Sequence, residues 1–483
     1  MAEIRLTEHP ILQFKRGRKI SFTFNGKKLD GHEGETVAAA LHAAGVTTYR
    51  RSPQLHRPRG FFCAIGKCSS CLMTVDGVPN VRICITPLRE GMKVCSPKGK
   101  GQLPEDDPAT IWTWPGQYVD KILETEVAII GAGPAGLSAA VETTRMGAET
   151  VVFDENDGIG GQLIKQTHMF FGSKEQHAKV RGIDIAPLLL EQIDDSRAQI
   201  MLEATAIGLY ADKTLGVVRR QELFGLRAQK IIMASGASEN MLAFEHCDLP
   251  GVYGAGAVQT LMNVYGLIPG RRVLMVGAGN IGLIVSYQLL QAGVEVVEVI
   301  EAAPYIGGYH VHAAKIRRAG VPIHTCHTIT KASGQEKVEG AVVAQVDSHW
   351  QPIPNTQREL AVDVICLAVG LSPTAELLFQ AGCQSCYIPE LGGHVAVHDE
   401  NLETTVKGIY VAGDASGIEE ASTAMLEGRL AGLCAAESLG KKAISERKEE
   451  ILSQLKELRT GPFGEKARKG KEMMRQEACR YGL

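Results

Sequence analysis

The 483-residue chain has no strong excess of charge, because 51 Lys and Arg side chains stand against 54 Asp and Glu, a formal net charge of −3. This balance gives no electrostatic reason to expect nucleic acid or an anionic membrane surface as a partner. No apolar run approaches the roughly 18 residues that a membrane span needs. The first ten residues contain Glu3, Arg5 and Glu8 and no apolar stretch, which argues against a signal or transit peptide. We therefore expect a cytoplasmic protein that acts on small molecules.

The chain is too long for one hydrophobic core. At roughly 150 residues per domain, its length predicts about three domains. Apolar residues make up 45% of the sequence, enough to fill several cores.

Twelve cysteines are present, and four of them crowd into a short segment as Cys63-x4-Cys68-x2-Cys71-x12-Cys84. In a reducing compartment such cysteines are ligands, redox groups or buried thiols rather than a disulfide framework. The spacing places three thiolates on one loop, as in plant-type 2Fe-2S ferredoxins. Structural zinc is the main alternative, but its usual paired C-x2-C arrangement is absent. The sequence thus predicts an iron–sulfur cluster, most simply a 2Fe-2S cluster.

The pair Cys383-x2-Cys386 has the spacing of a thioredoxin-type dithiol. It does not follow a glycine-rich strand-turn-helix, as a flavin-adjacent dithiol should, so a dithiol reductase stays an alternative only. The remaining cysteines are isolated and are expected to be ordinary thiols: Cys95, Cys247, Cys326, Cys366, Cys434 and Cys479.

The segment before the cysteine cluster has the pattern of a ferredoxin-like domain. Alternating apolar residues flank Asn25-Gly26, which predicts a hairpin. A helix should follow, capped by Thr36 and ended by Gly45. The segments 96–101 and 104–108, rich in Pro, Gly and charged residues, indicate a linker. We expect a β-grasp 2Fe-2S domain over residues 1–108.

A nucleotide-binding strand-turn-helix begins at residue 126. The apolar strand 126–130 leads into Gly131, Gly133 and Gly136, where the first glycine makes the tight turn, the second admits a pyrophosphate and the third allows helix–strand packing. The next strand ends in Asp154, 18 residues after Gly136, whose carboxylate can accept ribose hydroxyls.

Later segments favour FAD as the dinucleotide that binds at this site. Gly161 and Gln162 follow the second strand as in thioredoxin-reductase-like flavoproteins, where they run beside the flavin. Gly236 ends a further apolar strand, and residues 408–414 resemble the family's strand ending in Gly413-Asp414, whose Asp holds the ribityl chain.

A second strand-turn-helix carries Gly277, Gly279 and Gly282, and Glu301 ends its next strand 19 residues later. An acidic residue there favours NAD over NADP. Arg317 and Arg318 lie close to Glu301 in sequence and could favour a phosphorylated ribose. The second site could therefore also bind NADP or another adenine nucleotide, or be an unoccupied remnant.

The expected fold class is α/β, with two nested three-layer dinucleotide-binding domains of the thioredoxin-reductase type after the ferredoxin-like domain. The segment 361–370 resembles 229–236, which suggests that the chain leaves the first domain, builds the second and returns. The expected boundaries are 109–268 and 359–440 for the two parts of the FAD domain, 269–358 for the second nucleotide domain and 441–483 for a tail.

The tail carries twelve Lys and Arg against seven Asp and Glu. Its apolar residues have the spacing of an amphipathic helix, broken at Gly461-Pro462: Ile444, Ile451, Leu452, Leu455 and Leu458. It is either a solvated helical tail that packs one face on the body or a docking arm for a partner subunit.

Placed together, these pieces resemble the alpha subunits of heteromeric amine and imino-acid dehydrogenases, a group with sarcosine oxidase, hydrogen cyanide synthase, opine oxidase and dye-linked proline or hydroxyproline dehydrogenase. Four segments between residues 15 and 440 carry the resemblance: 56–60, 249–259, 413–420 and 426–430. The chain differs from sarcosine oxidase alpha in keeping all four cluster cysteines and in stopping before an aminomethyl-transfer domain. This difference puts a folate-linked reaction in doubt.

The resemblance implies an electron-transferring FAD and 2Fe-2S subunit of an enzyme acting on CH–NH or CH–NH2 donors. Substrate would be oxidised on a separate beta-type flavoprotein subunit, and some relatives also hold FMN between the subunits. No catalytic acid or base stands out in this chain. The histidines at 168, 177, 310 and 312 are expected to be surface or packing residues. The alternatives are a self-sufficient NAD(P)H-dependent oxidoreductase and a non-enzymatic scaffold.

Overall fold

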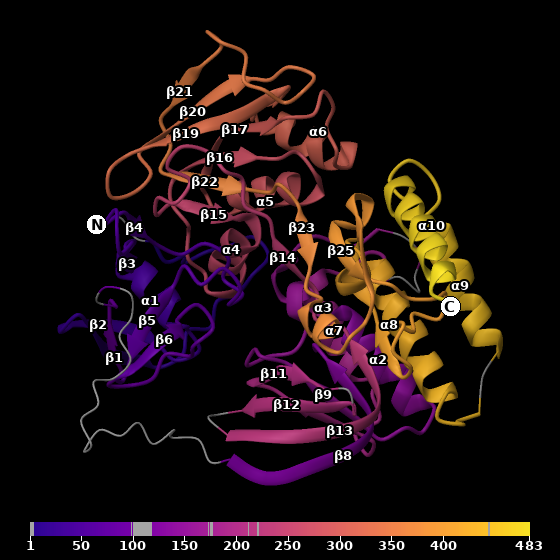
Figure 1. Ribbon diagram of the computed structural model, residues 1–483. Helices are drawn as coiled ribbons and strands as arrows, with labels where there is room; N and C mark the ends of the chain where they lie inside the picture. The colour runs from indigo at the N-terminus through magenta and orange to yellow at the C-terminus, as the bar shows by residue number, and fades with distance from the viewer. Residues whose placement is uncertain are drawn as a thin grey trace. The chain divides into compact units, whose positions relative to one another are not determined.

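A computed structural model describes residues 4–97, 99, 118–171, 173, 177–210, 212–219, 222–442 and 445–483 (Figure 1). The chain forms two compact units, one of residues 1–111 with 239–370 and the other of 112–238 with 371–483. Apart from Ser96, Pro97 and Gly99, the linker expected at 96–108 lies outside the described residues. No described helix is both long and apolar enough to span a membrane.

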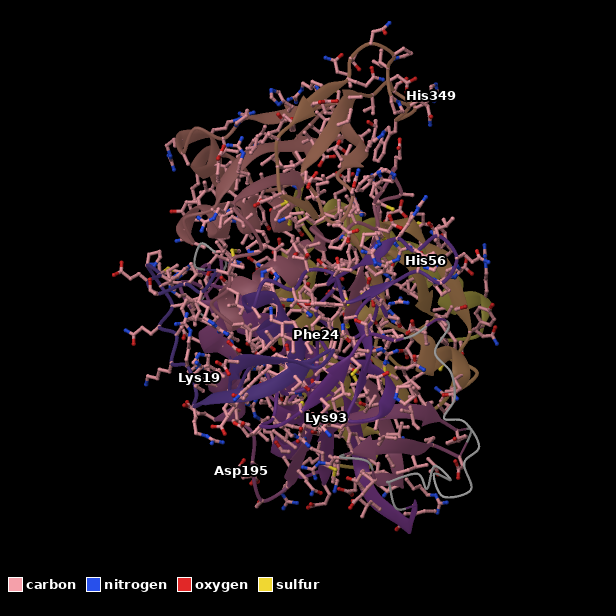
Figure 2. All side chains as sticks on the ribbon, turned by 90° about the vertical axis from the view of Figure 1, so that its left-hand side faces the viewer. Lys19, Phe24, His56, Lys93, Asp195 and His349 are labelled. Atoms are coloured by element: carbon pink, nitrogen blue, oxygen red, sulfur yellow. The ribbon has the colours of Figure 1, made fainter. Side chains whose placement is uncertain are left out.

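The first unit begins with a five-stranded sheet in the order β2-β1-β7-β5-β6. Asn25 and Gly26 form the predicted two-residue hairpin turn, with φ of 48° and 81°, between β1 and β2. Thr36 caps helix α1 by accepting a hydrogen bond from Ala39 N, as predicted. In Figure 2, Lys19 and Phe24 mark the ends of β1, and Lys93 starts the neighbouring β7. The elements of this domain are β1 (Lys19–Phe24), β2 (Lys27–His32), α1 (Val37–Ala43), β3 (Arg50–Arg51), β4 (Pro58–Arg59), β5 (Leu72–Val75), β6 (Val78–Arg82) and β7 (Lys93–Cys95).

The second nucleotide domain lies in the same unit, built on a parallel sheet in the order β15-β22-β16-β17-β18. A three-stranded antiparallel sheet, β19-β20-β21, follows it. The elements are β15 (Val252–Gly254), α4 (Ala255–Gln259), the π-helical turn η3 (Thr260–Val264), β16 (Arg272–Val276), α5 (Asn280–Gln291), β17 (Glu295–Glu301), α6 (His310–Arg318), β18 (Ile323–Thr325), β19 (His327–Ser333), β20 (Gly340–Gln345), β21 (Arg358–Leu360) and β22 (Val364–Leu367).

The ferredoxin-like domain and the second nucleotide domain share one continuous hydrophobic core. Phe22 and Leu41 from the first belong to the same buried cluster as Leu261 and Val273 from the second. Gly254 N also donates to the carbonyl of Phe62, at 3.0 Å. The two domains therefore form one body rather than two bodies joined by a linker.

The resemblance between segments 361–370 and 229–236 suggested that the chain returns to the FAD domain at 361–370, but it does not return there. Its strand β22 pairs with β16 and β15 inside the second nucleotide sheet. The two segments look alike because they hold equivalent positions, each lying parallel beside the strand that precedes a glycine-rich turn. The expected boundaries at 268 and 358 therefore fall inside one unit, which ends at Gly370.

The second unit contains a seven-stranded sheet in the order β10-β9-β8-β13-β12-β11, with β26 paired to β13. The chain does return to this sheet, but through β26, which lies parallel to β13 with Ile231 opposite Ile409. The elements of the sheet and its connections are β8 (Tyr118–Ile130), α2 (Pro134–Arg145), β9 (Thr150–Phe153), the 3-10 helix η2 (Gly161–Lys165), α3 (Gly182–Leu190), β10 (Ala198–Met201), β11 (Ala204–Leu209), β12 (Thr214–Arg219), β13 (Glu222–Met233) and β14 (Ala237–Glu239). The later elements are β23 (Leu371–Pro373), α7 (Glu376–Gln380), β24 (Ser385–Ile388), the 3-10 helix η4 (Pro389–Leu391), β25 (Gly393–Ala396), β26 (Ile409–Val411), the 3-10 helix η5 (Gly413–Ser416) and α8 (Ala421–Glu437).

The tail forms two helices, α9 (Ser445–Leu458) and α10 (Glu465–Arg480), with the predicted break at Gly461-Pro462 between them. Ile451 and Leu455 are buried in the core that α2 and α8 share. Leu452 is exposed, and Ile444 lies outside the described residues. The tail therefore packs one amphipathic face on its own unit.

Candidate functional site

The four clustered cysteines come together in the ferredoxin-like domain. Cys63, Cys71 and Cys84 are buried, whereas Cys68 is exposed. Hydrogen bonds from the thiols of Cys68 and Cys84 hold the pKa of Cys63 well below its usual value, and the Cys84 thiol also lowers the pKa of Cys71. The thiols therefore touch in the order Cys68, Cys63, Cys84, Cys71. Soft thiolates held this close to one another are the ligand set of an iron–sulfur cluster.

The loop between Cys63 and Cys71 turns back on itself through three left-handed residues. Ala64, Gly66 and Ser69 have φ of 58°, 71° and 56°. For a residue other than glycine this conformation costs about 1–2 kcal/mol. In return, the backbone N–H of Cys68 points at the sulfur of Cys63, at 3.4 Å. The strained turns thus aim backbone donors at the sulfurs, as cluster loops require.

Within the described residues, no three or more His, Cys, Asp or Glu side chains surround a single point where one metal ion could sit. A 2Fe-2S cluster does not need such a point, because each of its two irons takes two of the four protein ligands. The contacts of Cys63 with Cys68 and of Cys71 with Cys84 fit a division of the four ligands into two pairs.

The first glycine-rich turn gathers several of the predicted nucleotide-binding residues. A side chain at Gly131 would meet the carbonyl of Ala234 at 2.3 Å, and one at Gly136 would meet the carbonyl of Gly131 at 1.7 Å. Gly133, in contrast, has only the Cα of Gly161 near it, at 3.9 Å. The backbone is therefore close-packed behind the turn and open in front, at the N-terminus of α2, where a pyrophosphate would bind.

Asp154 and Gly413 both lie against the first glycine-rich turn. Asp154 accepts hydrogen bonds from the backbone N–H groups of Ala132 and Asn156, at 2.8 and 2.9 Å. Gly413 has φ of 68°, and a side chain there would meet the Cβ of Ala135 at 2.8 Å. Residues more than 270 apart in sequence thus meet at the N-terminus of one helix.

The other predicted residues of this site lie at its borders. Gln162 is exposed on η2, directly after Gly161. Gly236 follows β13 with φ of 70°, and its carbonyl accepts a hydrogen bond from Thr374 N at 2.9 Å.

Asp414 is partly buried in η5, directly after Gly413. Burial raises the pKa of this carboxyl to about 7, although a hydrogen bond from Glu419 N opposes the shift. A buried carboxyl with a raised pKa destabilises the folded protein when it is ionised. Hydroxyl groups of a bound molecule could donate hydrogen bonds to it and so stabilise its ionised form.

The substitution Asp414→Asn should stabilise the cofactor-free protein at alkaline pH. The usual pKa of this aspartate is 3.8 and its pKa in the folded protein is about 7. Between these two pH values the folded state keeps a proton that the unfolded state has lost, so the free energy of unfolding falls as pH rises from about 4 to 7. The amide of the variant cannot ionise, and its advantage should grow by about 1–2 kcal/mol from pH 5 to pH 8, a value discounted for partial exposure. Urea unfolding of both proteins at the two pH values measures this. An advantage that is flat with pH would contradict it.

The second glycine-rich turn repeats the first in detail. A side chain at Gly282 would meet the carbonyl of Gly277 at 2.0 Å, while Gly279 has no atom within 4 Å. Glu301 accepts hydrogen bonds from Ala278 N and Ala303 N, at 2.8 and 2.9 Å, as Asp154 does in the first turn. Arg317 and Arg318 are exposed in the last turn of α6.

The two cysteines of the C-x2-C pair lie in different environments. Cys383 is buried beside Thr404 Oγ1 at 3.3 Å, and Cys386 packs against the cluster containing Leu391. Burial raises the pKa of both thiols, that of Cys386 to about 11. A reactive dithiol needs a lowered pKa, so the dithiol-reductase alternative gains no support.

The histidines without an expected catalytic role take packing or surface positions. His168 stacks on Phe170, with 5.5 Å between ring centroids, and His312 is buried beside Tyr309. His310 is exposed at the start of α6. Burial lowers the pKa of His177 and of His312.

Sequence reasoning missed three charged residues near Asp414: Glu427, Arg459 and Lys471. Glu427 is 2% exposed and accepts hydrogen bonds from Gly413 N and Ser416 Oγ, at 3.0 and 2.5 Å. The available signal was a Glu in the middle of α8, where most of the neighbouring residues are small or apolar. Nothing in the sequence indicated that Arg459 and Lys471 would reach it.

The family comparisons agree with this geometry. Residues 125–428 match the model of the pyridine nucleotide-disulphide oxidoreductases, and residues 17–99 match that of a 2Fe-2S iron–sulfur cluster binding domain. The sarcosine oxidase subunit alpha of Rhizobium meliloti (strain 1021) is 27% identical over 493 residues, which cover 89% of this chain and 46% of that protein. The chain thus spans about half the length of this relative.

Solved structures show the same fold. L-proline dehydrogenase from P. horikoshii matches 95% of this chain and 79% of its own, with a TM-score of 0.69 and 25% identity. Thioredoxin reductase from T. acidophilum matches 65% of this chain and 99% of its own, with a TM-score of 0.55 and 21% identity.

These matches confirm the predicted fold class, the two cofactors FAD and 2Fe-2S, and the likeness to the alpha-subunit group. The chain combines the fold of a flavin oxidoreductase with a 2Fe-2S cluster binding domain. It belongs to the pyridine nucleotide-disulphide oxidoreductase family, as a member with an N-terminal 2Fe-2S domain and with sarcosine oxidase subunit alpha among its relatives.

Proposed function

We propose that this chain is the electron-transferring subunit of a heteromeric amino- or imino-acid dehydrogenase or oxidase, of the proline, hydroxyproline, sarcosine, glycine or opine type. The observation that carries the proposal is the union of a flavoprotein fold and a four-cysteine loop in one chain whose relatives are named for sarcosine and proline oxidation. Substrate would be oxidised on a beta-type flavoprotein partner, with electrons passing to an acceptor through this chain.

FAD is proposed to bind along the first glycine-rich turn. The N-terminus of α2 and the open face of Gly133 would hold its pyrophosphate, Asp154 its adenosine ribose, and Asp414 its ribityl hydroxyls. Gly161, Gln162 and Gly236 would border it, as proposed from the sequence.

Cys63, Cys68, Cys71 and Cys84 would hold the cluster. When bound, FAD accepts two electrons and the cluster moves one at a time, so the pair suits conversion between a hydride donor and a one-electron carrier. The chain's own part is to bind and orient both groups.

The proposal is tested by anaerobic reduction of the purified chain, followed by its visible spectrum. One of proline, sarcosine and glycine should bleach the flavin, and only after a beta-type flavoprotein subunit is added. Full bleaching by one of these substrates with this chain alone would overturn the division of labour between subunits.

A self-sufficient NAD(P)H-dependent oxidoreductase is the second candidate. The observation in its favour is the second glycine-rich turn, with Gly277, Gly279, Gly282 and Glu301 arranged as a nucleotide cradle. Rapid bleaching of the flavin by NADH or NADPH, with no second polypeptide present, would favour it over the leading proposal.

A further inference from the structure

Two buried acids support the segment that carries Asp414. Glu419 and Glu427 have side chains that are 6% and 3% exposed. Glu427 accepts the hydrogen bond from Gly413 N, and the backbone N–H of Glu419 donates to Asp414 Oδ1 at 3.4 Å. The position of Gly413 therefore depends on the Glu427 carboxylate, and that of Asp414 on the backbone at Glu419, whose own carboxylate is anchored by the tail.

Both acids are neutralised by cations from the C-terminal tail. Arg459, just after α9, donates Nε and Nη2 to the two oxygens of Glu419 at 3.0 and 2.7 Å, and Nη2 to Glu427 at 2.6 Å. Lys471 of α10 lies 2.8 Å from Glu427 and donates to Ser416 Oγ at 2.9 Å. Burial alone would raise the pKa of Glu427, but Lys471 and Arg459 outweigh it and hold the pKa low.

The tail packs closely against its own unit near Arg459 and Lys471. A side chain at Gly470 would meet Leu391 Cδ2 at 2.7 Å, so α10 packs closely against η4 at this glycine. Met474 is buried in the same cluster as Leu391. At the other end of α9, Arg447 donates to the buried Glu142 of α2 at 3.3 Å. Part of the tail's excess of positive charge thus points inward, at acids of its own unit.

We infer that helices α9 and α10 are a working part of the FAD site, in which Arg459 and Lys471 are positioning residues that hold Gly413 and Asp414 in the form that binds FAD. The inference rests on the proposed placement of FAD at Asp414. It assigns the tail a role beyond that of a solvated appendage or a docking arm.

The physical reason is the cost of an unpaired buried charge. Removing one cation leaves a buried carboxylate without its partner, which is strongly unfavourable unless the surroundings move or water enters. The movable neighbour is the Gly413–Glu420 segment, because its own backbone N–H groups bind Glu427 and Asp414. We therefore expect the loss to show as weaker FAD binding.

The test is FAD titration of the cofactor-free full-length chain, followed by flavin fluorescence and visible circular dichroism. Arg459→Ala and Lys471→Ala should each raise the Kd for FAD by about tenfold or more. Arg459→Lys keeps the charge but loses the fork that grips Glu419, and should restore part of the affinity. Arg468→Ala is the matched control, because Arg468 pairs with Glu472 in an exposed i,i+4 pair of α10, at 2.7 Å.

Thermal unfolding of each cofactor-free variant separates positioning from folding. Folded Arg459→Ala and Lys471→Ala proteins with a Kd within twofold of the parent would overturn the inference. If Arg459→Ala does not fold, an unchanged Kd and unchanged visible circular dichroism in folded Lys471→Ala or Arg459→Gln would overturn it equally. A parent chain that binds no FAD would instead refute the proposed FAD site itself.

Discussion

Replacing Cys63 with serine should leave the purified protein without its iron–sulfur cluster. Cys63 is the thiol that contacts both Cys68 and Cys84, so its loss removes one ligand and breaks the linked set. We expect iron and acid-labile sulfide to fall from about two of each per chain to near zero. FAD should stay bound, because its proposed site lies in the other unit. Metal analysis and flavin content of the same sample measure both.

Cys95→Ser is the control for this experiment. Cys95 ends β7 in the same domain and is exposed, yet it is not one of the four linked thiols. Its replacement should leave the iron content unchanged. One zinc per chain in the parent protein, with no sulfide, would contradict the cluster assignment and revive the structural zinc alternative.

Gly136→Ala should abolish FAD binding. The added Cβ would stand 1.7 Å from the carbonyl of Gly131, a backbone atom that cannot move without opening the turn in front of α2. Overpacking of this kind costs typically about 1–3 kcal/mol of stability. The larger effect should be on the pyrophosphate site, since displacement of the turn misdirects the N–H groups that bind it. We expect FAD to be lost on gel filtration.

Gly282→Ala is a matched control, because it makes the same change in the second glycine-rich turn, with the Cβ 2.0 Å from the carbonyl of Gly277. It lies in the other unit, so the flavin content should match that of the parent. Any nucleotide that copurifies with the parent at the second turn should be lost in this variant. Equal loss of FAD from both variants would contradict the assignment of FAD to the first turn.

Local features of this protein could be predicted because their causes lie close together in sequence. The Asn25-Gly26 hairpin follows from two residues that tolerate positive φ. The Thr36 cap follows from a hydroxyl three residues before its donor. The glycines of each turn follow from the short reach between a strand and the next helix.

Features set by distant partners could not be predicted in the same way. The apolar strand β22 has the composition of a buried parallel strand and would suit either nucleotide sheet, so only its pairing with β16 decides its place. The tail likewise shows an amphipathic pattern that does not say what its apolar face meets.

The sequence by itself determined two predictions through short-range geometry: the spacing of Cys63, Cys68, Cys71 and Cys84 predicts an iron–sulfur cluster, and the first glycine-rich turn predicts a dinucleotide. The tertiary structure alone decided that the ferredoxin-like domain shares a core with the second nucleotide domain, and that Arg459 and Lys471 neutralise Glu419 and Glu427. The physical reason is that a buried charge must be paired, and the pairing partner is selected by packing in space rather than by distance along the chain.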